Sequence, residues 1–269
     1  MTLKEKRILI TGASGGIGSA IATALDAQGC QLILSGRNQS KLQNLRQTLK
    51  GEDHHIICAD LALGAGREAL LIRAKQLDCN MLINSLGVNQ LSLLTQSTDQ
   101  EVEAMLRANL QIPIQLCLGL IPFFSQQSSA VIVNIGSILG SIGYAGSTLY
   151  CSSKFGLRGF TESLRRELAD SSIRVLYFAP RATNTELNTD KAQAMNQALH
   201  NKIDDPNIVA QRLIRQLKSN HCNSYYLGWP EKFFVRLNSL FPQLVDKALL
   251  KQLPIIRRFT APSTSGAPK

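Results

Sequence analysis

The fold is decided by one stretch near the amino terminus, Arg7-Ile8-Leu9-Ile10-Thr11-Gly12-Ala13-Ser14-Gly15-Gly16-Ile17-Gly18. Its first five residues predict a buried strand, and a helical pattern over residues 16–28 follows the glycines at once. Gly12, Gly16 and Gly18 would let the backbone approach a pyrophosphate, whose charge the helix N–H groups and the positive helix end would hold. Ser14 and Ile17 lie in the same turn and join the glycines as candidate cofactor contacts. A tight strand-to-helix connection without a ligand is the structural alternative for this motif alone.

Short β-branched runs alternate with helical patterns along the chain. The runs predict strands at residues 7–11, 31–35, 55–59, 81–84, 131–135 and 174–178, with a seventh at 225–228. The helical patterns cover residues 16–28, 39–50, 66–76, 99–124, 150–169 and 206–218. Strands that alternate with helices build βαβ units. The sequence therefore predicts an α/β fold in one domain: a Rossmann-type, doubly wound parallel sheet of about seven strands with helices on both faces.

Composition and charge limit the classes of function. Hydrophobic residues make up 44% of the 269-residue chain, which is ordinary for a globular protein. The net charge of +10 favours anionic partners, but no nucleic-acid-binding motif accompanies it, so nucleic acid is not expected. The six cysteines lack C-x-x-C spacing and indicate free thiols in a reducing compartment, and no clustered ligands imply a metal.

The amino terminus indicates where the protein is found. Residues 1–7 are charged and lack the apolar stretch of a secretory signal, and no uninterrupted apolar run reaches the length of a bilayer span. We expect a cytoplasmic protein, or at most one that is peripheral at the inner face of the membrane.

The end of the second predicted strand indicates which dinucleotide binds. An acidic side chain there would accept a hydrogen bond from the ribose 2′-hydroxyl and repel a 2′-phosphate, but the turn reads Ser35-Gly36-Arg37-Asn38. Arg37 can pair with a phosphate, and Ser14 and Ser35 could add donors. We therefore expect NADP(H) in preference to NAD(H). The alternative is that Arg37 is a solvated surface cation.

A second set of residues has the chemistry of proton transfer. Ser137 follows the strand at 131–135, and Tyr150 and Lys154 are four residues apart, so they share one helix face. A phenol with a pKa of about 10 is a poor acid or base near neutrality, and a neighbouring ammonium favours its phenolate. Lys154 is therefore expected to tune Tyr150, and could also bind the nicotinamide ribose.

The glycine spacing, the series Ser137, Tyr150 and Lys154, and the strand–helix order resemble the short-chain dehydrogenase/reductase family over roughly residues 7–228. The resemblance implies that Tyr150 exchanges a proton with a carbonyl oxygen to which Ser137 bonds, and that Asn109 completes a proton relay. A mid-helix Asn could instead mark a kink. Asp60 matches the family's adenine contact, or it caps a helix.

Two places depart from the family's pattern. Where the family reads Asn-Asn-Ala-Gly, this chain has Asn84-Ser85-Leu86-Gly87, and the retained Asn84 and Gly87 are candidate cofactor contacts. Where the family has Pro-Gly followed by a Thr at the nicotinamide amide, this chain has Pro180-Arg181-Ala182-Thr183-Asn184-Thr185. Pro180 and Thr185 are retained. Arg181 replaces a glycine, which changes the local backbone or supplies a cation beside the substrate mouth.

The carboxyl-terminal part differs in character from the rest. We assign residues 1–230 to the dinucleotide-binding catalytic domain and residues 231–259 to a basic amphipathic segment. Residues 260–269 are expected to form a disordered tail. Residues 231–259 carry six basic against two acidic residues among many apolar ones. Such a segment can lie on an anionic membrane surface, cover the substrate pocket as a lid, or form a dimer contact.

These observations favour an NADP(H)-dependent oxidoreductase that interconverts a carbonyl and an alcohol on a lipophilic small molecule, in lipid metabolism. One alternative substrate is a 3-oxoacyl thioester on an acyl carrier protein, whose acidity would suit the basic surface. An alternative of another class is a non-catalytic NADP(H)-sensing or scaffold module. The resemblance also implies a homo-oligomer, either a dimer or a tetramer.

Overall fold

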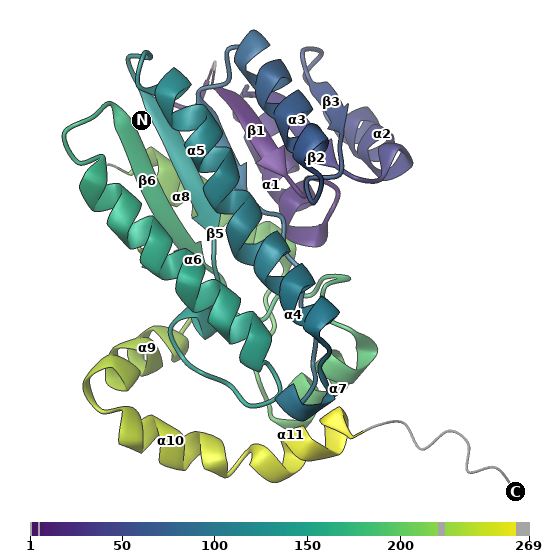
Figure 1. Ribbon diagram of the computed structural model, residues 1–269, viewed down its shortest axis with the longest axis vertical. Helices are drawn as coiled ribbons and strands as arrows, with labels where there is room; N and C mark the ends of the chain where they lie inside the picture. Colours follow the sequence, from purple (N-terminus) through teal and green to yellow (C-terminus); the bar gives the residue numbers. More distant parts are fainter. Residues whose placement is uncertain (1, 5, 220–223, 262–269) are drawn as a thin grey trace, which may run out of the picture.

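A computed structural model describes residues 2–4, 6–219 and 224–261. Its centre is a sheet of seven parallel strands in the order β3-β2-β1-β4-β5-β6-β7 (Figure 1). The strands are β1 (Arg7–Thr11), β2 (Gln31–Gly36), β3 (His55–Cys58), β4 (Met81–Asn84), β5 (Ala130–Ile135), β6 (Ile173–Ala179) and β7 (Tyr225–Tyr226). The order reverses direction between β1 and β4, as in a doubly wound fold. The predicted fold class is confirmed.

Helices cover both faces of the sheet. The helices are α1 (Gly16–Asp26), α2 (Gln39–Thr48), α3 (Gly64–Gln76), α4 (Asp99–Leu106), α5 (Ile112–Phe124), α6 (Thr148–Glu167), α7 (Asp190–Ala198), α8 (Pro206–Lys218), α9 (Glu231–Leu240), α10 (Pro242–Leu250) and α11 (Leu253–Thr260). Successive strand residues alternate between the faces: Ile8 and Ile10 pack with α1, α2 and α8, whereas Leu9 packs with α3 and α5. Apolar side chains on both sides of each central strand explain why the predicted strands read as continuous hydrophobic runs.

Local polar residues fix where several helices begin. The Asn38 side chain accepts from the Lys41 N–H at the start of α2, and Asp205 accepts from the Asn207 N–H at the start of α8. Thr98 and Glu101 form a reciprocal capping box at the start of α4. These caps agree with boundaries that the sequence predicts to within a few residues.

The helix predicted at 99–124 is interrupted. A π-helical turn, Arg107–Gln111, separates α4 from α5 and contains Asn109. π-Helical turns widen the ladder locally and often occur at functional sites. The mid-helix distortion suggested for Asn109 is therefore present. The joined span Asp99–Phe124 is long and apolar enough to cross a membrane by length and composition alone, yet α5 packs six buried side chains in the fold.

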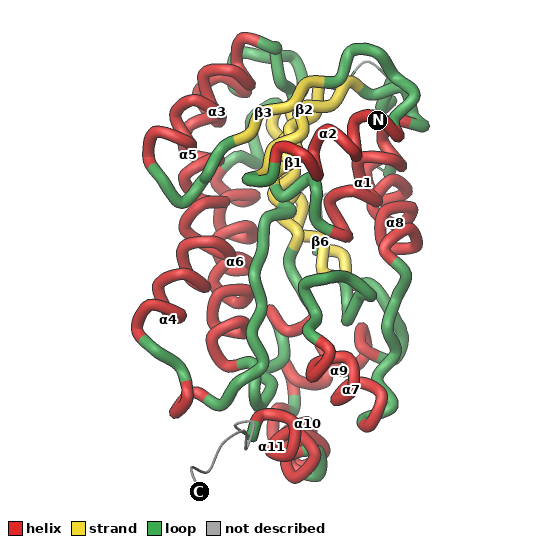
Figure 2. Tube along the Cα trace, turned by 90° about the vertical axis from the view of Figure 1, so that its right-hand side faces the viewer, coloured by secondary structure: helices red, strands yellow, loops and turns green. Residues whose placement is uncertain are grey.

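The carboxyl-terminal helices lie beyond the carboxyl ends of the strands. In Figure 1, α10 and α11 run along this end of the molecule, with α9 folded back against α10 and α7 beside α11, and Figure 2 shows the same end from the side. Thr260, the first residue of the predicted tail, instead ends α11, is buried, and donates to the Ile256 carbonyl. Residues 262–269 lie outside the described residues. The predicted strand at 225–228 is also shorter, since only Tyr225 and Tyr226 pair with β6.

Candidate active site

A cavity of about 1330 Å³ opens at the carboxyl ends of the strands. It begins at the glycine turn after β1, where the order of strands reverses, and passes Ser137, Tyr150 and Lys154. Its far end is bounded by α7 and the carboxyl-terminal helices. Doubly wound folds bind ligands in the crevice at this point of reversal, so the cavity is the candidate active site.

The glycine turn is shaped for close approach. Gly12 has a φ of 62°, and a Cβ there would lie 2.9 Å from the Leu86 Cα. A Cβ at Gly16 would lie 2.5 Å from the Thr185 Cγ2, and one at Gly18 would collide with the Gly12 carbonyl oxygen. Gly12, Ser14, Gly16, Ile17 and Gly18 all line the cavity at the start of α1. A narrow turn beneath a helix N-terminus fits the pyrophosphate of a dinucleotide.

The loop between β2 and α2 holds the residues expected to select the dinucleotide. Arg37 is exposed and lines the cavity beside Asn38 and Lys41. Lys41 pairs with Glu186 across the cavity mouth at 2.7 Å. Ser35 does not belong to this group: it is fully buried, and its hydroxyl has no hydrogen-bond partner among the described residues. The suggestion that Ser35 is a phosphate donor is wrong, because its side chain points into the protein and not into the cavity.

Asp60 lines the cavity and is exposed. Its carboxylate accepts from the Ala62 N–H at 3.0 Å, which closes a turn two residues on. The suggested helix cap is wrong, because α3 starts later and Leu63 occupies its N-cap position.

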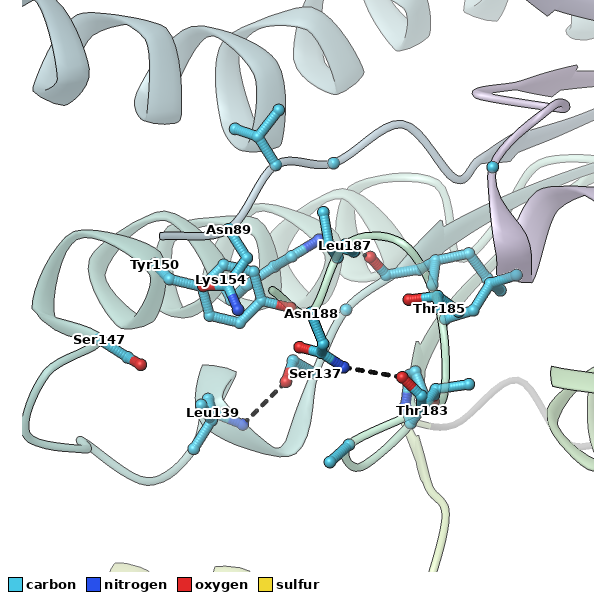
Figure 3. Close-up of a pocket in the computed structure, with 18 of the residues that line it drawn as sticks. Asn89, Ser137, Leu139, Ser147, Tyr150, Lys154, Thr183, Thr185, Leu187 and Asn188 are labelled. Carbon is cyan, nitrogen blue, oxygen red and sulfur yellow. Dashed lines mark hydrogen bonds between the residues drawn. The ribbon is translucent and has the colours of Figure 1, made fainter. Parts of the chain in front are cut away.

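Ser137, Tyr150 and Lys154 meet at the middle of the cavity (Figure 3). Tyr150 is buried, and Ser137 lies beside it in the cavity lining, where the Ser137 side-chain oxygen accepts from the Leu139 N–H at 3.1 Å. Lys154 Nζ lies 5.8 Å from the centre of the Tyr150 ring and donates to the Ile135 carbonyl at 2.9 Å. The end of β5 and the first turns of α6 thus bring three residues together that are up to 17 positions apart in the sequence.

Burial dominates the pKa values of this group. It raises the pKa of Tyr150 to about 12, against the opposing effect of the neighbouring Ser137 side chain, and it lowers the pKa of Lys154 to about 8. We expected Lys154 to favour the phenolate. In this arrangement the pKa of Tyr150 moves the other way, because desolvation penalises both charged forms. Near neutral pH Tyr150 therefore keeps a proton that it can donate.

Asn109 lies behind this group. Its Oδ1 accepts from the Val88 N–H at 2.8 Å, and its Nδ2 donates to the Val88 carbonyl at 2.9 Å and to Ser153 Oγ at 3.0 Å. Gly87 separates it from Lys154, since a Cβ at Gly87 would lie 3.4 Å from Asn109 Oδ1 and 3.7 Å from Lys154 Nζ. The π-helical turn therefore holds Asn109 fully buried behind Gly87, and unlike Lys154 it does not itself line the cavity.

Comparisons with known proteins agree on one family. The family model for short chain dehydrogenases matches residues 6–196. The chain is 36% identical over 229 residues to the 3-oxoacyl-[acyl-carrier-protein] reductase of Rickettsia typhi, covering 83% of this chain and 92% of that protein. It is 29% identical over 223 residues to an uncharacterised oxidoreductase of Staphylococcus aureus strain MW2, covering 82% and 95%.

The chain belongs to the short-chain dehydrogenase family. A short-chain dehydrogenase from Streptomyces avermitilis has the same fold, with a TM-score of 0.80 at 24% identity over 93% of this chain and 99% of that one. The protein is thus an oxidoreductase of the short-chain dehydrogenase type that acts on CH–OH groups. Members of this family typically bind a nicotinamide cofactor.

The first departure from the short-chain dehydrogenase pattern leaves the turn after β4 intact. Thr11 Oγ1 accepts from the N–H groups of Ser85 and Leu86 at 3.2 and 3.3 Å, and Leu86 packs partly against the core. Asn84 itself is buried and donates to Asn134 Oδ1 at 2.8 Å. Its side chain thus ties β4 to β5 and does not line the cavity, unlike Gly87. The expectation of a direct side-chain contact from Asn84 to the cofactor is not met.

The second departure, Arg181, binds two carboxylates from other segments of the chain, and we call this set of contacts the Arg181 clamp. Its guanidinium donates to both oxygens of Asp204 at 3.0 and 2.6 Å, to both oxygens of Glu231 at 3.2 and 3.1 Å, and to the Trp229 carbonyl at 3.2 Å. Gly228, with a φ of 110°, leaves room for it, since a Cβ there would lie 3.0 Å from the Arg181 Cδ. Arg181 therefore joins the end of β6 to the start of α9 and is not a free cation beside the substrate.

Pro180 and Thr185 lie where this loop borders the cavity. The Pro180 carbonyl accepts from the Ile138 N–H at 3.0 Å, which holds the loop against the turn that carries Ser137. Thr185 lies over Gly16 at the pyrophosphate end.

Several cavity residues were not found from the sequence. Asn89 lies near Tyr150 in Figure 3, and its buried Oδ1 has no hydrogen-bond partner among the described residues. Tyr144 donates to Gln252 Oε1 at 2.9 Å, which links the loop before α6 to α11. The far wall is apolar and includes Leu91, Ile142, Met195, Phe234, Val245 and Leu249. Of these residues, only Asn89 could have been suggested by the sequence as a cavity residue, because it lies two positions after Gly87, a predicted cofactor contact. No three His, Cys, Asp or Glu side chains within the described ranges are placed to hold a metal ion.

Proposed function

We propose that this enzyme transfers a hydride between NADP(H) and the carbonyl or alcohol carbon of a lipophilic small molecule. The observation that carries the proposal is the position of the Tyr150 and Ser137 hydroxyls. They lie between a glycine-lined crevice on one side and an apolar wall from Leu91, Ile142 and Phe234 on the other. A dinucleotide fits the first part and an apolar substrate the second.

Each catalytic residue has a role that its contacts support. A bound nicotinamide supplies or accepts the hydride at the substrate carbon. In reduction, Tyr150 donates its hydroxyl proton to the carbonyl oxygen as the C–H bond forms, and in oxidation it takes the proton back. Ser137 hydrogen-bonds the same oxygen. Lys154 would bind the nicotinamide ribose, and Asn109 would extend the proton relay from its position behind Gly87.

The preference for the phosphorylated cofactor is supported by charge. Arg37 lines the cavity just beyond the end of β2, in a turn that carries no carboxylate, whereas Lys41 on α2 is already paired with Glu186. Arg37 is proposed to pair with the 2′-phosphate through its fork of donors. NAD(H) is the less favoured cofactor because it lacks the group that Arg37 would bind. Asp60 is proposed to contact the adenine.

A 3-oxoacyl thioester on an acyl carrier protein is the second candidate substrate. It is favoured by the 36% identity to the Rickettsia typhi reductase and by the net charge of +10, which would attract an acidic carrier. The apolar wall at α9 and α10 supports the free lipophilic substrate instead. We further propose that residues 231–259 are a lid over the catalytic domain of residues 1–230, because their inner side chains line the cavity.

We also propose that the enzyme is a cytoplasmic homo-oligomer, a dimer or a tetramer. Large apolar side chains are exposed on the outer faces of α4, α5 and α6, namely Leu106, Leu118 and Phe155. Burial of these side chains against a second copy would remove them from water. Sedimentation velocity of Leu118→Asp against the wild type tests this interface, and an unchanged assembly would exclude Leu118 from it.

The deciding experiment is a turnover panel with the full-length protein. Long-chain ketones, long-chain aldehydes and a 3-oxoacyl thioester, free and on acyl carrier protein, are each offered with NADPH or NADH, and loss of the reduced nicotinamide is followed. We expect turnover of an apolar carbonyl with NADPH. A preference for the carrier-bound thioester would support the second candidate. Tight NADPH binding without turnover of any substrate would support a sensing module, and a preference for NADH would overturn the role of Arg37.

A further inference from the structure

The outward faces of α9 and α10 repeat one pattern of side chains. On α9, Phe233, Arg236 and Leu240 are exposed at a spacing of three and four residues, which places them on one helix face. On α10 and its cap, Leu244, Lys247 and Lys251 repeat that spacing. Each face therefore mixes apolar with basic side chains, whereas the inner faces bury Val235 and Val245 against Ile138 and Ile142.

The apolar members of this surface are large and accessible. We call it the α9–α10 face, and its apolar side chains, each at least half exposed, are Trp229, Phe233, Leu240, Phe241 and Leu244. Trp229 stacks on Phe233 with ring centres 6.5 Å apart, so two aromatic rings lie together at one end of the face. Isolated exposed apolar residues are common, but several large ones on two helices that contact each other mark a candidate binding surface.

The charges around the face decide which partner fits. Five basic residues are exposed in residues 231–261, and these are Arg236, Lys247, Lys251, Arg257 and Arg258. The acidic residues there are Asp246, which is exposed, and Glu231, which Arg181 already binds. In a symmetric dimer through this face, the basic residues of two copies would meet and repel. An anionic lipid surface offers the opposite charge together with an apolar interior.

We propose that the α9–α10 face docks on an anionic lipid bilayer, with its aromatic and leucine side chains in the head-group boundary and its basic side chains on the lipid phosphates. The same helices line the cavity with Phe234, Val245 and Leu249 on their other side. Docking would then place the lid of the apolar cavity next to the membrane. The docking itself does not depend on the proposed reaction, and its test needs no turnover.

The chain carries a reporter at this site, because its one tryptophan is Trp229. Full-length protein is mixed with vesicles of phosphatidylcholine alone or of equimolar phosphatidylglycerol and phosphatidylcholine. We expect the emission of Trp229 to shift to shorter wavelength only with the anionic vesicles, to be quenched by lipids brominated in the acyl chain, and to lose this response as salt rises. No shift with anionic vesicles, or an equal shift with neutral ones, would overturn the proposal.

Two matched pairs of variants locate the contact. The double variant Arg236→Glu, Lys247→Glu should lower vesicle binding at least roughly tenfold, since each basic residue near an anionic surface contributes measurably to binding. Arg73→Glu with Arg212→Glu makes the same change in net charge on α3 and α8, where both residues are exposed, and should leave most of the binding. Equal losses in the two pairs would show attraction to the whole molecule and reject this face.

The apolar contribution is tested in the same way. The double variant Leu240→Ser, Leu244→Ser should reduce quenching by brominated lipid, while Ile72→Ser, which changes an exposed apolar residue on α3, should not. A blue shift that grows with protein concentration in the absence of vesicles would show that a second copy covers the face, and would overturn the proposal.

Discussion

The central sheet and the carboxyl-terminal helices are stabilised in different ways. β4 and β5 are buried along their whole length, with apolar side chains on both faces. In α9, α10 and α11, by contrast, burial is confined to Val235, Val245, Ile256 and Thr260. Burial of apolar area is the main source of folding free energy, so the sheet supplies the rigid frame of the enzyme.

The carboxyl-terminal helices are instead attached by specific polar contacts. Arg181 binds Glu231 at the start of α9, Asn238 donates to the Ser141 carbonyl at 3.0 Å, and Gln252 accepts from Tyr144. A few polar contacts fix position and cost little to break compared with a buried core. The difference teaches that Ser137, Tyr150 and Lys154 lie on the deeply buried sheet and the helix packed on it, whereas the far end of the cavity is bounded by helices that bury few side chains.

The largest expected effect tests the frame. Tyr150→Phe should lower turnover by about 10²-fold or more, because it removes the proton donor and keeps the buried ring in place. Cofactor binding and vesicle binding should stay near those of the wild type. Steady-state kinetics with the best substrate of the panel, together with NADPH titration, make the measurement. Turnover close to the wild-type value would remove Tyr150 from its proposed role.

The next effect tests the link between the two regions. Arg181→Met should destabilise the protein by about 2 kcal/mol, since it leaves the largely buried carboxylates of Asp204 and Glu231 without their partner. It should also expose α9 to protease more than it exposes the sheet. Chemical denaturation and limited proteolysis measure both effects.

Arg166→Met is the matched control for this clamp, because Arg166 pairs with Glu162 on the surface of α6 and is largely exposed. Its loss should cost well under about 1 kcal/mol. If the two substitutions cost the same, the clamp is no stronger than a surface ion pair and the two regions are joined by other contacts.

A third prediction uses pH to probe the frame. The pKa of Lys154 is about 8 in the folded protein and near 10.5 when unfolded. Between these values the unfolded chain binds more protons, so this residue makes stability rise with pH. The gain should reach roughly 2 kcal/mol by about pH 9.5, at 1.36 kcal/mol per pH unit. The penalty for burying the ammonium is fully present below about pH 8.

Lys154→Met removes this titration, so the stability difference between variant and wild type should shrink as pH rises. Urea denaturation of both proteins at several pH values measures it. A constant difference from about pH 7 to 10 would mean that Lys154 is not desolvated as its burial indicates.

The smallest effect lies at the cofactor end of the frame. Arg37→Asp should weaken NADPH binding about tenfold or more through lost pairing and new repulsion, while NADH binding changes little or improves. Titration of the two cofactors gives the ratio directly. Arg46→Asp makes the same change on α2, away from the cavity lining, and should leave the ratio unchanged. Equal effects of the two variants would count against a phosphate site at Arg37.

Local patterns in the sequence were enough to predict most of the central sheet and the glycine turn. The buried runs at Ile8 and Ile83 and the glycine turn at Gly12 are encoded within a few residues each, because strand burial and backbone freedom are local properties. The predicted fold class and family are confirmed by the sheet order and the family match. The π-helical turn around Asn109 was harder to predict from the sequence, since such a turn has no fixed amino-acid composition.

The sequence by itself determined the parallel sheet, its glycine turn and the candidate set Ser137, Tyr150 and Lys154, because each rests on residue types at short, fixed spacing. Only the tertiary structure decided what depends on neighbours far apart in the chain. It showed that Ser35 and Asn84 are buried away from the cavity, that Arg181 is bound by Asp204 and Glu231, and that burial sets the pKa of Tyr150. Solvent exposure and long-range pairing arise from packing, which no local pattern encodes.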